Sequence, residues 1–208
     1  DEAGIISYPA FIFPSEDFYA EWKHVETLKA HLEQLDATAI AVGSGVINDT
    51  VKYVSYLLSR KYMCVGTAAS MDGFTAYGSS ITKDGNKQTF DCPAPFGFVL
   101  DSGIAAEAPK ELAASGYADL IAKIPAAADW MIADAVGSEK IDEFAWGLVQ
   151  DGLKEALADP AAVRAGDVEK TQALADGLLM SGFAMQAIQS SRPASGAEHQ
   201  YSHCWDME

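Results

Sequence analysis

The feature that most restricts the fold is a short apolar run that passes directly into a glycine turn and then into a helical pattern. Residues 39–42 read Ala-Ile-Ala-Val without a polar interruption, and Gly43-Ser44-Gly45 follows at once. An uninterrupted apolar run of this length predicts a strand buried on both faces of a parallel sheet. Apolar side chains then recur at helical spacing, at Ile47, Val51, Val54 and Leu58. A strand that turns straight into a helix predicts an α/β fold with right-handed crossovers.

Other parts of the first hundred residues show the same two patterns, short apolar runs and apolar side chains at helical spacing. Residues 62–65 and 96–100 are apolar enough to be further strands, and residues 5–13, rich in Ile, Tyr and Phe, predict one more. Val25, Leu28, Leu32 and Leu35 predict a helix. The dipeptide Asp84-Gly85 between β-prone flanks predicts a hairpin.

The composition changes near residue 102. Residues 103–208 are rich in alanine and contain few β-branched runs, so we expect four or five helices there. The predicted fold class is therefore α/β, with a Rossmann-like parallel-sheet domain over residues 1–102 and an all-helical domain over residues 103–208.

The charge balance argues against several classes of partner. Fourteen Lys and Arg residues face thirty Asp and Glu residues, a net charge of −16. Nucleic acid and anionic membrane surfaces are recognised through clustered cations, so neither is expected as a partner. No apolar run reaches the roughly 20 residues that span a bilayer. Three widely spaced cysteines form no disulfide framework, and we expect a soluble, cytoplasmic protein.

Two segments that follow predicted strands carry candidate binding residues. The first runs from Gly45 to Asp49, where a glycine turn opening a helix lets a phosphate approach free backbone N–H groups. Asn48 stands where the usual dinucleotide fingerprint has its third glycine, so a tight turn without a ligand is the alternative. The second is residues 67–73, in which Thr67 and Ser70 offer hydroxyls and Asp72 a carboxylate. There the alternative is an ordinary turn with a helix cap.

A third candidate lies near the end of the chain. His199 and His203 are four residues apart and therefore lie on one helix face, with Ser195 as the predicted N-cap. A chance surface pair is the alternative, and two histidines are too few for a catalytic zinc, which takes three protein ligands. Asp119, embedded in an apolar helical pattern, is a candidate further ligand, because an acid there must be exposed, paired or bound to metal.

The motifs GSGVIND, TAASMDGFTAYGS, SGYADLIAK and SSRPASGAEHQYSH occur in this order and at separations that resemble one known family. They are similar to the sn-glycerol-1-phosphate dehydrogenases, and the ending HCWDME resembles their bacterial, AraM-like branch. That family belongs to the superfamily of iron-containing alcohol dehydrogenases and dehydroquinate synthases. The likeness runs from about residue 39 to the end of the chain.

The resemblance implies a reaction and a set of roles. It implies reduction of dihydroxyacetone phosphate by NADH or NADPH, one divalent zinc or nickel ion, a homodimer and a part in phospholipid biosynthesis. Asp119 and His199 would be metal ligands; Asp72, Asp119 and His203 would contact substrate; and Asp72 and His203 would be catalytic. The implied cofactor residues are Gly45, Val46, Ile47, Asn48, Asp49, Thr67, Ala68, Ala69 and Ser70.

The resemblance also implies parts that this sequence does not contain. The family's third metal ligand, a histidine of a His-Gly pair, would follow Glu208, and its first strand and helix would precede Asp1. We therefore expect an internal segment of the enzyme. Candidates to hold the substrate phosphate are Lys123, Arg192 and the Ser195-Gly196 backbone. The rival interpretations are a glycerol dehydrogenase acting on an unphosphorylated polyol, a dehydroquinate synthase, and an inactive, truncated nucleotide-binding scaffold.

Overall fold

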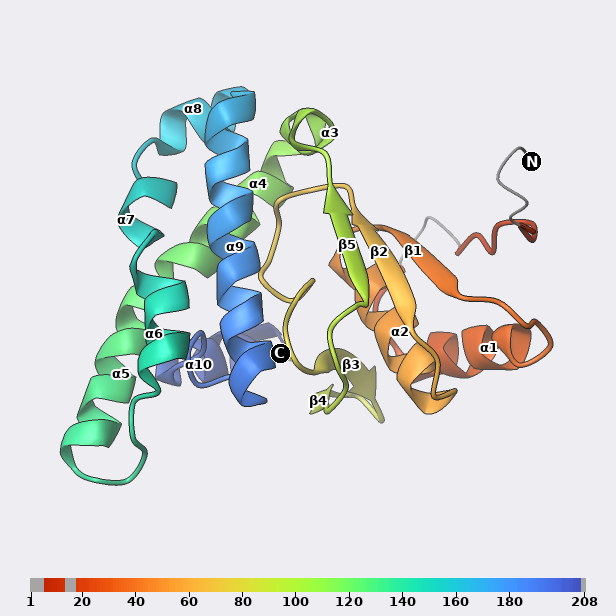
Figure 1. The fold of residues 1–208 in the computed structure, drawn as a ribbon, viewed down its shortest axis with the longest axis horizontal. Helices are drawn as coiled ribbons and strands as arrows, with labels where there is room; N and C mark the ends of the chain where they lie inside the picture. The colour runs from red at the N-terminus through yellow and green to blue at the C-terminus, as the bar shows by residue number, and fades with distance from the viewer. Residues whose placement is uncertain (1–5, 14–17, 207–208) are drawn as a thin grey trace.

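A three-stranded parallel sheet forms the centre of the first half of the chain (Figure 1). The computed structural model describes residues 6–13 and 18–206, and the side chains of His203 and Asp206 lie outside that description. The strands are β1 (Ala39–Gly43), β2 (Tyr62–Gly66) and β5 (Gly97–Leu100), in the order β1-β2-β5. Both neighbouring pairs of strands are parallel, with Val42 of β1 opposite Val65 of β2 and Val65 opposite Val99 of β5.

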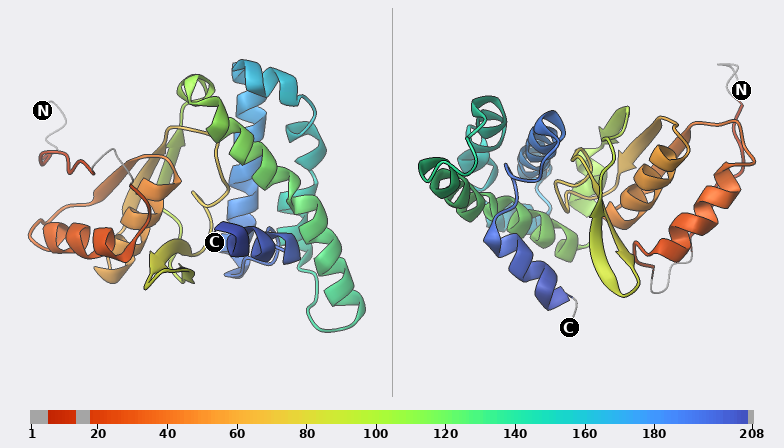
Figure 2. Two further views of the ribbon diagram at one scale, coloured as in Figure 1. Left: turned by 180° about the vertical axis from the view of Figure 1, so that it is seen from behind. Right: turned by 90° about the horizontal axis from the view of Figure 1, so that it is seen from below.

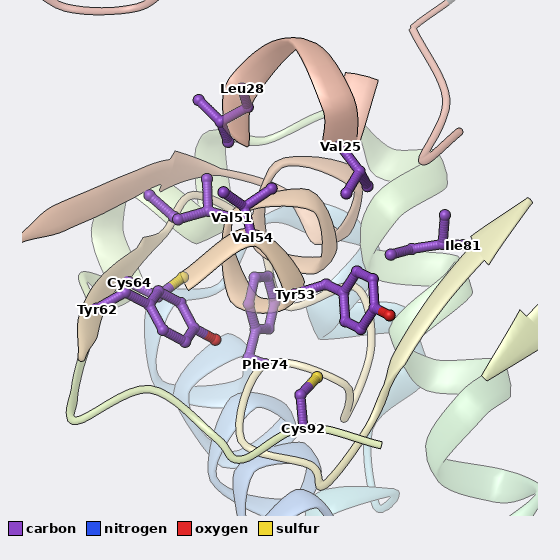
Figure 3. Close-up of a cluster of buried hydrophobic side chains, with 11 residues drawn as sticks. Val25, Leu28, Val51, Tyr53, Val54, Tyr62, Cys64, Phe74, Ile81 and Cys92 are labelled. Atoms are coloured by element: carbon purple, nitrogen blue, oxygen red, sulfur yellow. The ribbon is translucent and has the colours of Figure 1, made fainter. Parts of the chain in front are cut away.

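Two helices lie on one side of this sheet, the second packed directly on its strands and the first packed against the second. They are α1 (Trp22–Leu32) and α2 (Gly45–Leu57), and both match the helices predicted from apolar spacing. Figure 3 shows the cluster of buried side chains between them and the sheet. It comprises Val25, Leu28, Ala41, Val51, Tyr53, Val54, Tyr62, Cys64, Phe74, Ile81 and Cys92.

The opposite face of the sheet is open to solvent, so the prediction that residues 39–42 are buried on both faces was wrong. Ile40 and Val42 are 59% and 61% exposed, while Ala41 between them is buried. Val99 on β5 is 52% exposed. Successive side chains of a strand point to opposite faces, and the described helices cover only the face that holds Ala41.

The predicted hairpin is confirmed. It consists of β3 (Ser79–Lys83) and β4 (Asn86–Phe90), paired antiparallel with Lys83 opposite Asn86. Asp84 and Gly85 form its two-residue turn with φ of 53° and 77°. Positive φ at both central residues is the type I′ geometry that Asp-Gly favours.

Residues 6–13 form no strand, contrary to the prediction for residues 5–13, of which Ile5 lies outside the described residues. A strand requires a partner ladder, and none of the described strands pairs with residues 6–13. The aromatic side chains instead contact α1. The Phe11 ring lies 4.9 Å from the His31 ring, and Phe13 packs at the edge of the core cluster.

From Ser102 onward every described element is a helix, as predicted, but there are eight of them within the described residues rather than four or five. Aspartates divide the chain into shorter helices, since Asp101, Asp142, Asp159 and Asp167 each accept an N-terminal hydrogen bond. The helices are α3 (Ser102–Glu107), α4 (Lys110–Ile121), α5 (Lys123–Ala135), α6 (Glu143–Gln150), α7 (Leu153–Ala156), α8 (Pro160–Ala165), α9 (Val168–Ile188) and α10 (Ala197–Asp206). Over the described part of the chain, no helix is both long and apolar enough to cross a membrane.

The two halves meet along the segment between β2 and β3, which lies between the sheet and α9 in Figure 1. Two helix glycines allow this close approach. A Cβ at Gly116 of α4 would lie 2.0 Å from the carbonyl oxygen of Ala69. A Cβ at Gly182 of α9 would lie 2.1 Å from Thr75 Oγ1 and 2.4 Å from the carbonyl oxygen of Asp72. Any side chain at either position therefore forces the halves apart.

We expect Gly182→Ala to lower the free energy of unfolding by about 1–3 kcal/mol, the usual cost of overpacking a well-filled interior. Gly152→Ala is the matched control, because nothing lies within 4 Å of its added Cβ. That control is expected to stay within about 0.5 kcal/mol of the unsubstituted chain. Urea unfolding measures both, and equal stability of the two variants would contradict the close approach of α9.

Candidate functional site

Three charged side chains meet where the segment after β2 touches the helices. Lys123 Nζ, at the start of α5, lies 2.7 Å from Asp72 Oδ2 and 2.7 Å from Asp119 Oδ1. The backbone N–H of Asp72 donates to Asp119 Oδ2 at 2.8 Å, and the Ser181 hydroxyl donates to Asp72 Oδ2 at 2.8 Å. The structure thus brings together the sequence segments that carry Asp72 and Asp119, while their contact with a substrate stays a prediction.

The charges of this cluster are held in a buried setting. Lys123 is fully buried and Asp72 is 8% exposed. Burial raises the pKa of Asp119, and the nearby Asp72 carboxylate raises it further, against the opposing effect of Lys123. Burial alone lowers the pKa of Lys123, but the two carboxylates outweigh burial, and the pKa lies above its ordinary value. One ammonium therefore balances two carboxylates, which leaves the cluster acidic and suited to hydroxyl donors or cations.

Lys123 does not have the role predicted for it from the sequence. It was a candidate to bind the substrate phosphate, but its buried ammonium already binds Asp72 and Asp119. Its i,i+4 spacing from Asp119 was the available sequence signal for this pairing. Ser181 was missed, because a single serine in an Ala-, Leu- and Gly-rich helix carries no sequence signal of a distant partner.

The glycine turn lies at the N-terminus of α2, where an anion can bind. Gly43 has φ of 154°, and Ser44 at the N-cap makes no side-chain hydrogen bond to the helix. The first N–H groups of a helix have no intrahelical partner, and the helix dipole favours a negative charge there. Gly45 lies against the Met71 thioether, since an added Cβ would be 2.7 Å from its sulfur. This arrangement fits the pyrophosphate of a dinucleotide cofactor.

Asn48 is fully buried, and Asp49 beside it is half-buried. Asn48 Nδ2 donates to the Gly73 carbonyl at 3.4 Å, and Asn48 Oδ1 accepts from the Tyr62 hydroxyl at 3.1 Å. Burial raises the pKa of the Asp49 carboxyl to about 6, although the Lys52 ammonium opposes this shift. The assignment of these two residues to the cofactor stays a prediction. The backbone N–H groups of the first turn of α2, which precede Asn48, would be the hydrogen-bond donors to a cofactor phosphate.

The second predicted cofactor segment lies beside the first. The backbone N–H of Thr67 donates to the Gly43 carbonyl at 3.2 Å, which places the two turns next to each other at the ends of β1 and β2. Ala68 and Ala69 are buried, whereas Thr67 and Ser70 are half-buried. The ends of neighbouring parallel strands are the usual place for a ligand in an open α/β sheet.

The helix that carries the histidines packs against α5 (Figure 2). Its N-terminus is capped by Asp129 of α5, whose Oδ2 accepts from the Ala197 N–H at 2.7 Å, so the prediction of Ser195 as the cap was wrong. A carboxylate from another helix provides the same acceptor, and only the fold brings it there. His199 lies in the first turn of α10, and the His203 side chain lies outside the described residues.

The other candidates for the substrate phosphate also have partners. Arg192 Nε lies 3.1 Å from Glu139 Oε2, and its Nη2 donates to the Asp129 carbonyl at 3.2 Å. The Gly196 N–H donates to Glu198 Oε1 at 3.1 Å. A phosphate at this position would have to displace these carboxylates.

The predicted metal ligands fit zinc or nickel in chemical type but do not complete a site. A carboxylate oxygen and an imidazole nitrogen are ordinary ligands of both metals. Among the described residues, however, no group of three or more His, Cys, Asp or Glu side chains could hold a metal ion. Both oxygens of Asp119 already accept hydrogen bonds, with one further lone pair left on each. The pair Asp119 and His199 stays a prediction.

Comparison with known proteins confirms the resemblance drawn from the four motifs. The family model of the iron-containing alcohol dehydrogenases matches residues 6–109, half of the chain. The chain is 36% identical over 184 residues to a glycerol-1-phosphate dehydrogenase [NAD(P)+] of Bacillus velezensis, covering 88% of this chain and 46% of that protein. It is 38% identical over 186 residues to the protein of the same name from Methanocorpusculum labreanum, covering 89% and 51%.

The fold is similar to that of solved dehydrogenase structures. The crystal structure of glycerol dehydrogenase from Schizosaccharomyces pombe superimposes with a TM-score of 0.71 at 20% identity, covering 94% of this chain and 50% of that one. This similarity confirms the predicted fold class. The chain spans about half the length of the curated relatives it matches.

We expect Lys123→Met to lower the free energy of unfolding by about 3–5 kcal/mol, because it leaves Asp72 and Asp119 buried without their cation. Lys110→Met is the matched control, since Lys110 lies on the neighbouring α4 and is exposed. The control should change stability by no more than about 0.5 kcal/mol. Chemical denaturation compares them, and a loss below about 1 kcal/mol for Lys123→Met would show that the buried pairing contributes little.

Proposed function

Because this chain belongs to the iron-containing alcohol dehydrogenase family, we propose that the protein reduces dihydroxyacetone phosphate to sn-glycerol 1-phosphate with NADH or NADPH. The observation that carries this proposal is the 36–38% identity to glycerol-1-phosphate dehydrogenases across nearly nine-tenths of the chain. The joined cluster of Asp72, Asp119 and Lys123 supports it, because it gives the matched residues one common site. A homodimer and a cytoplasmic role in phospholipid biosynthesis belong to the same proposal.

The cofactor is proposed to bind across the two turns at the ends of β1 and β2. The N–H groups of Gly45, Val46 and Ile47 would donate to its pyrophosphate. Thr67 and Ser70, next to this turn, would contact the rest of the dinucleotide. When bound, NADH or NADPH supplies the hydride that reduces the ketone.

Asp72 is proposed to orient the substrate. Its Oδ2 already accepts from Lys123 and Ser181, so its carboxylate is held in one direction. The remaining acceptor sites can take a hydrogen bond from a substrate hydroxyl. Fixing that hydroxyl fixes the neighbouring carbonyl carbon relative to the cofactor, which is the positioning part of catalysis.

Asp119 and His199 are the proposed metal ligands, completed by a third ligand that the resemblance places after Glu208. A divalent zinc or nickel ion would supply Lewis-acid polarisation of the substrate carbonyl. His203, one turn beyond His199, is proposed to contact the substrate and deliver the final proton, since imidazole titrates near neutral pH. Lys123 keeps the Asp119 carboxylate in place for this role.

The direct test uses the purified full-length protein and follows loss of reduced nicotinamide absorbance. We expect turnover of dihydroxyacetone phosphate with a kcat/KM at least about tenfold above that for dihydroxyacetone, because charge-assisted contacts to a phosphate contribute about 1.5–3 kcal/mol. Treatment with a chelator should abolish turnover, and added Zn²⁺ or Ni²⁺ should restore it.

The other outcomes separate the rival functions. A preference for the unphosphorylated ketone would indicate a glycerol dehydrogenase and overturn the proposed substrate. Cofactor binding without turnover of either ketone would indicate a nucleotide-binding scaffold. Turnover that a chelator does not reduce would contradict the proposed metal requirement and leave the proposed substrate unaffected.

We expect Gly45→Val to weaken NAD(P)H binding by about tenfold or more, because its side chain blocks approach of a phosphate to the backbone. Fluorescence titration of the reduced cofactor measures the affinity. The double variant Gly45→Val/Met71→Ala controls for the contact with Met71. Recovery of affinity in the double variant would assign the loss to Met71 displacement, and unchanged affinity in the single variant would contradict the phosphate site.

A further inference from the structure

A second buried lysine binds the segment that follows Asp72. Lys52 of α2 is 1% exposed, and its Nζ donates to the carbonyl oxygens of Gly73, Ala76 and Gly78 at 2.7, 2.9 and 3.1 Å. An ammonium group has three donors, so these three bonds use all of its hydrogen-bonding capacity. No part of this side chain is directed at solvent or at a ligand.

The segment 73–78 depends on such contacts, because it consists of turns and bends without a ladder of its own. Buried carbonyl groups need a donor, and Lys52 provides it for three of them. Asn48, one helical turn before Lys52, donates to the same Gly73 carbonyl. From the other side, the Thr75 hydroxyl donates to the Leu179 carbonyl of α9 at 2.9 Å. The segment is thus held between α2 and α9.

Lys52 also connects two parts of the proposed active site. Its helix begins at the glycine turn, and the segment that it holds begins directly after Asp72. Asp49 provides a negative charge near the buried ammonium, and burial nevertheless lowers the pKa of Lys52. Burying a charge costs several kcal/mol before its contacts are counted. A neutral residue would fill the space, so the three oriented bonds are what this lysine adds.

We propose that Lys52 is a positioning residue, which fixes the Asp72 carboxylate relative to the N-terminus of α2 by binding the carbonyls of Gly73, Ala76 and Gly78. This proposal rests on the proposed function, in which Asp72 orients the substrate and the N-terminus of α2 binds the cofactor. It predicts that loss of the ammonium disturbs catalysis while cofactor binding at α2 continues.

The test compares Lys52→Met with Val54→Ala in the full-length protein. Val54 lies on the same helix and is completely buried, but it packs in the apolar core cluster. Lys52→Met should lower kcat/KM for dihydroxyacetone phosphate by about a hundredfold, the size of effect that a displacement of about 1 Å produces. The dissociation constant of NAD(P)H should stay unchanged. Val54→Ala should lower the melting temperature and leave both kinetic constants as they are.

Hydrogen–deuterium exchange provides a readout that does not depend on activity. Lys52→Met should speed amide exchange in peptides covering residues 72–78, and Val54→Ala should not. If the unsubstituted protein turns over neither ketone, the proposed function fails, and the exchange experiment still decides whether Lys52 holds the segment. Unchanged exchange, or equal kinetic losses in the two variants, would overturn the positioning role.

A second variant covers the case in which Lys52→Met does not fold. Lys52→Ala leaves a cavity lined by the three carbonyls, and n-propylammonium replaces the atoms removed. Added n-propylammonium should restore kcat/KM, whereas its neutral isostere 1-propanol should not. Equal rescue by both compounds would show that the side chain only fills space, and no rescue by the ammonium would likewise contradict the proposal.

Discussion

The structure depends on one buried ammonium group, that of Lys123, which lies between the carboxylates of Asp72 and Asp119. Asp72 follows the sheet strand β2, whereas Asp119 and Lys123 belong to the helices α4 and α5. The ion pairs therefore join the α/β half of the chain to the helical half. Because Lys123 is fully buried and both carboxylates are largely shielded from water, loss of any one of the three leaves a poorly compensated charge where the halves meet.

The segment between β2 and β3 is the part of the chain on which both halves converge. It has little regular structure, and its polar backbone groups are satisfied by side chains from either side. Lys52 of α2 binds three of its carbonyls, and Ser181 and Thr75 connect it to α9. Gly116 and Gly182 bring the helix backbones close enough for these contacts. Such a segment is held in place without being part of a sheet or helix.

This arrangement gives the proposed chemistry a rigid frame. The turn that would bind the cofactor phosphates lies at the start of α2. Asp72, whose carboxylate would orient the substrate, directly precedes Gly73, and the Gly73 carbonyl accepts a hydrogen bond from Asn48 of α2. The ligand pair Asp119 and His199 is different, because its members lie on separate helices and the described residues provide no third ligand.

The sequence by itself determined the order and type of most elements and the family. Short uninterrupted apolar runs predict β1, β2 and β5, and apolar residues at helical spacing predict α1 and α2. Asp84-Gly85 predicts the hairpin, and all of these signals are local. Only the tertiary structure decided that the Ile40 face of the sheet is open, that Asp129 caps α10, and that Lys52 and Lys123 are buried. The segment 6–13 has strand composition without a strand, because composition does not supply a pairing partner. In each case the deciding contact joins residues far apart in the chain, and the free energy of a buried charge or an unpaired edge depends on that distant neighbour rather than on local sequence.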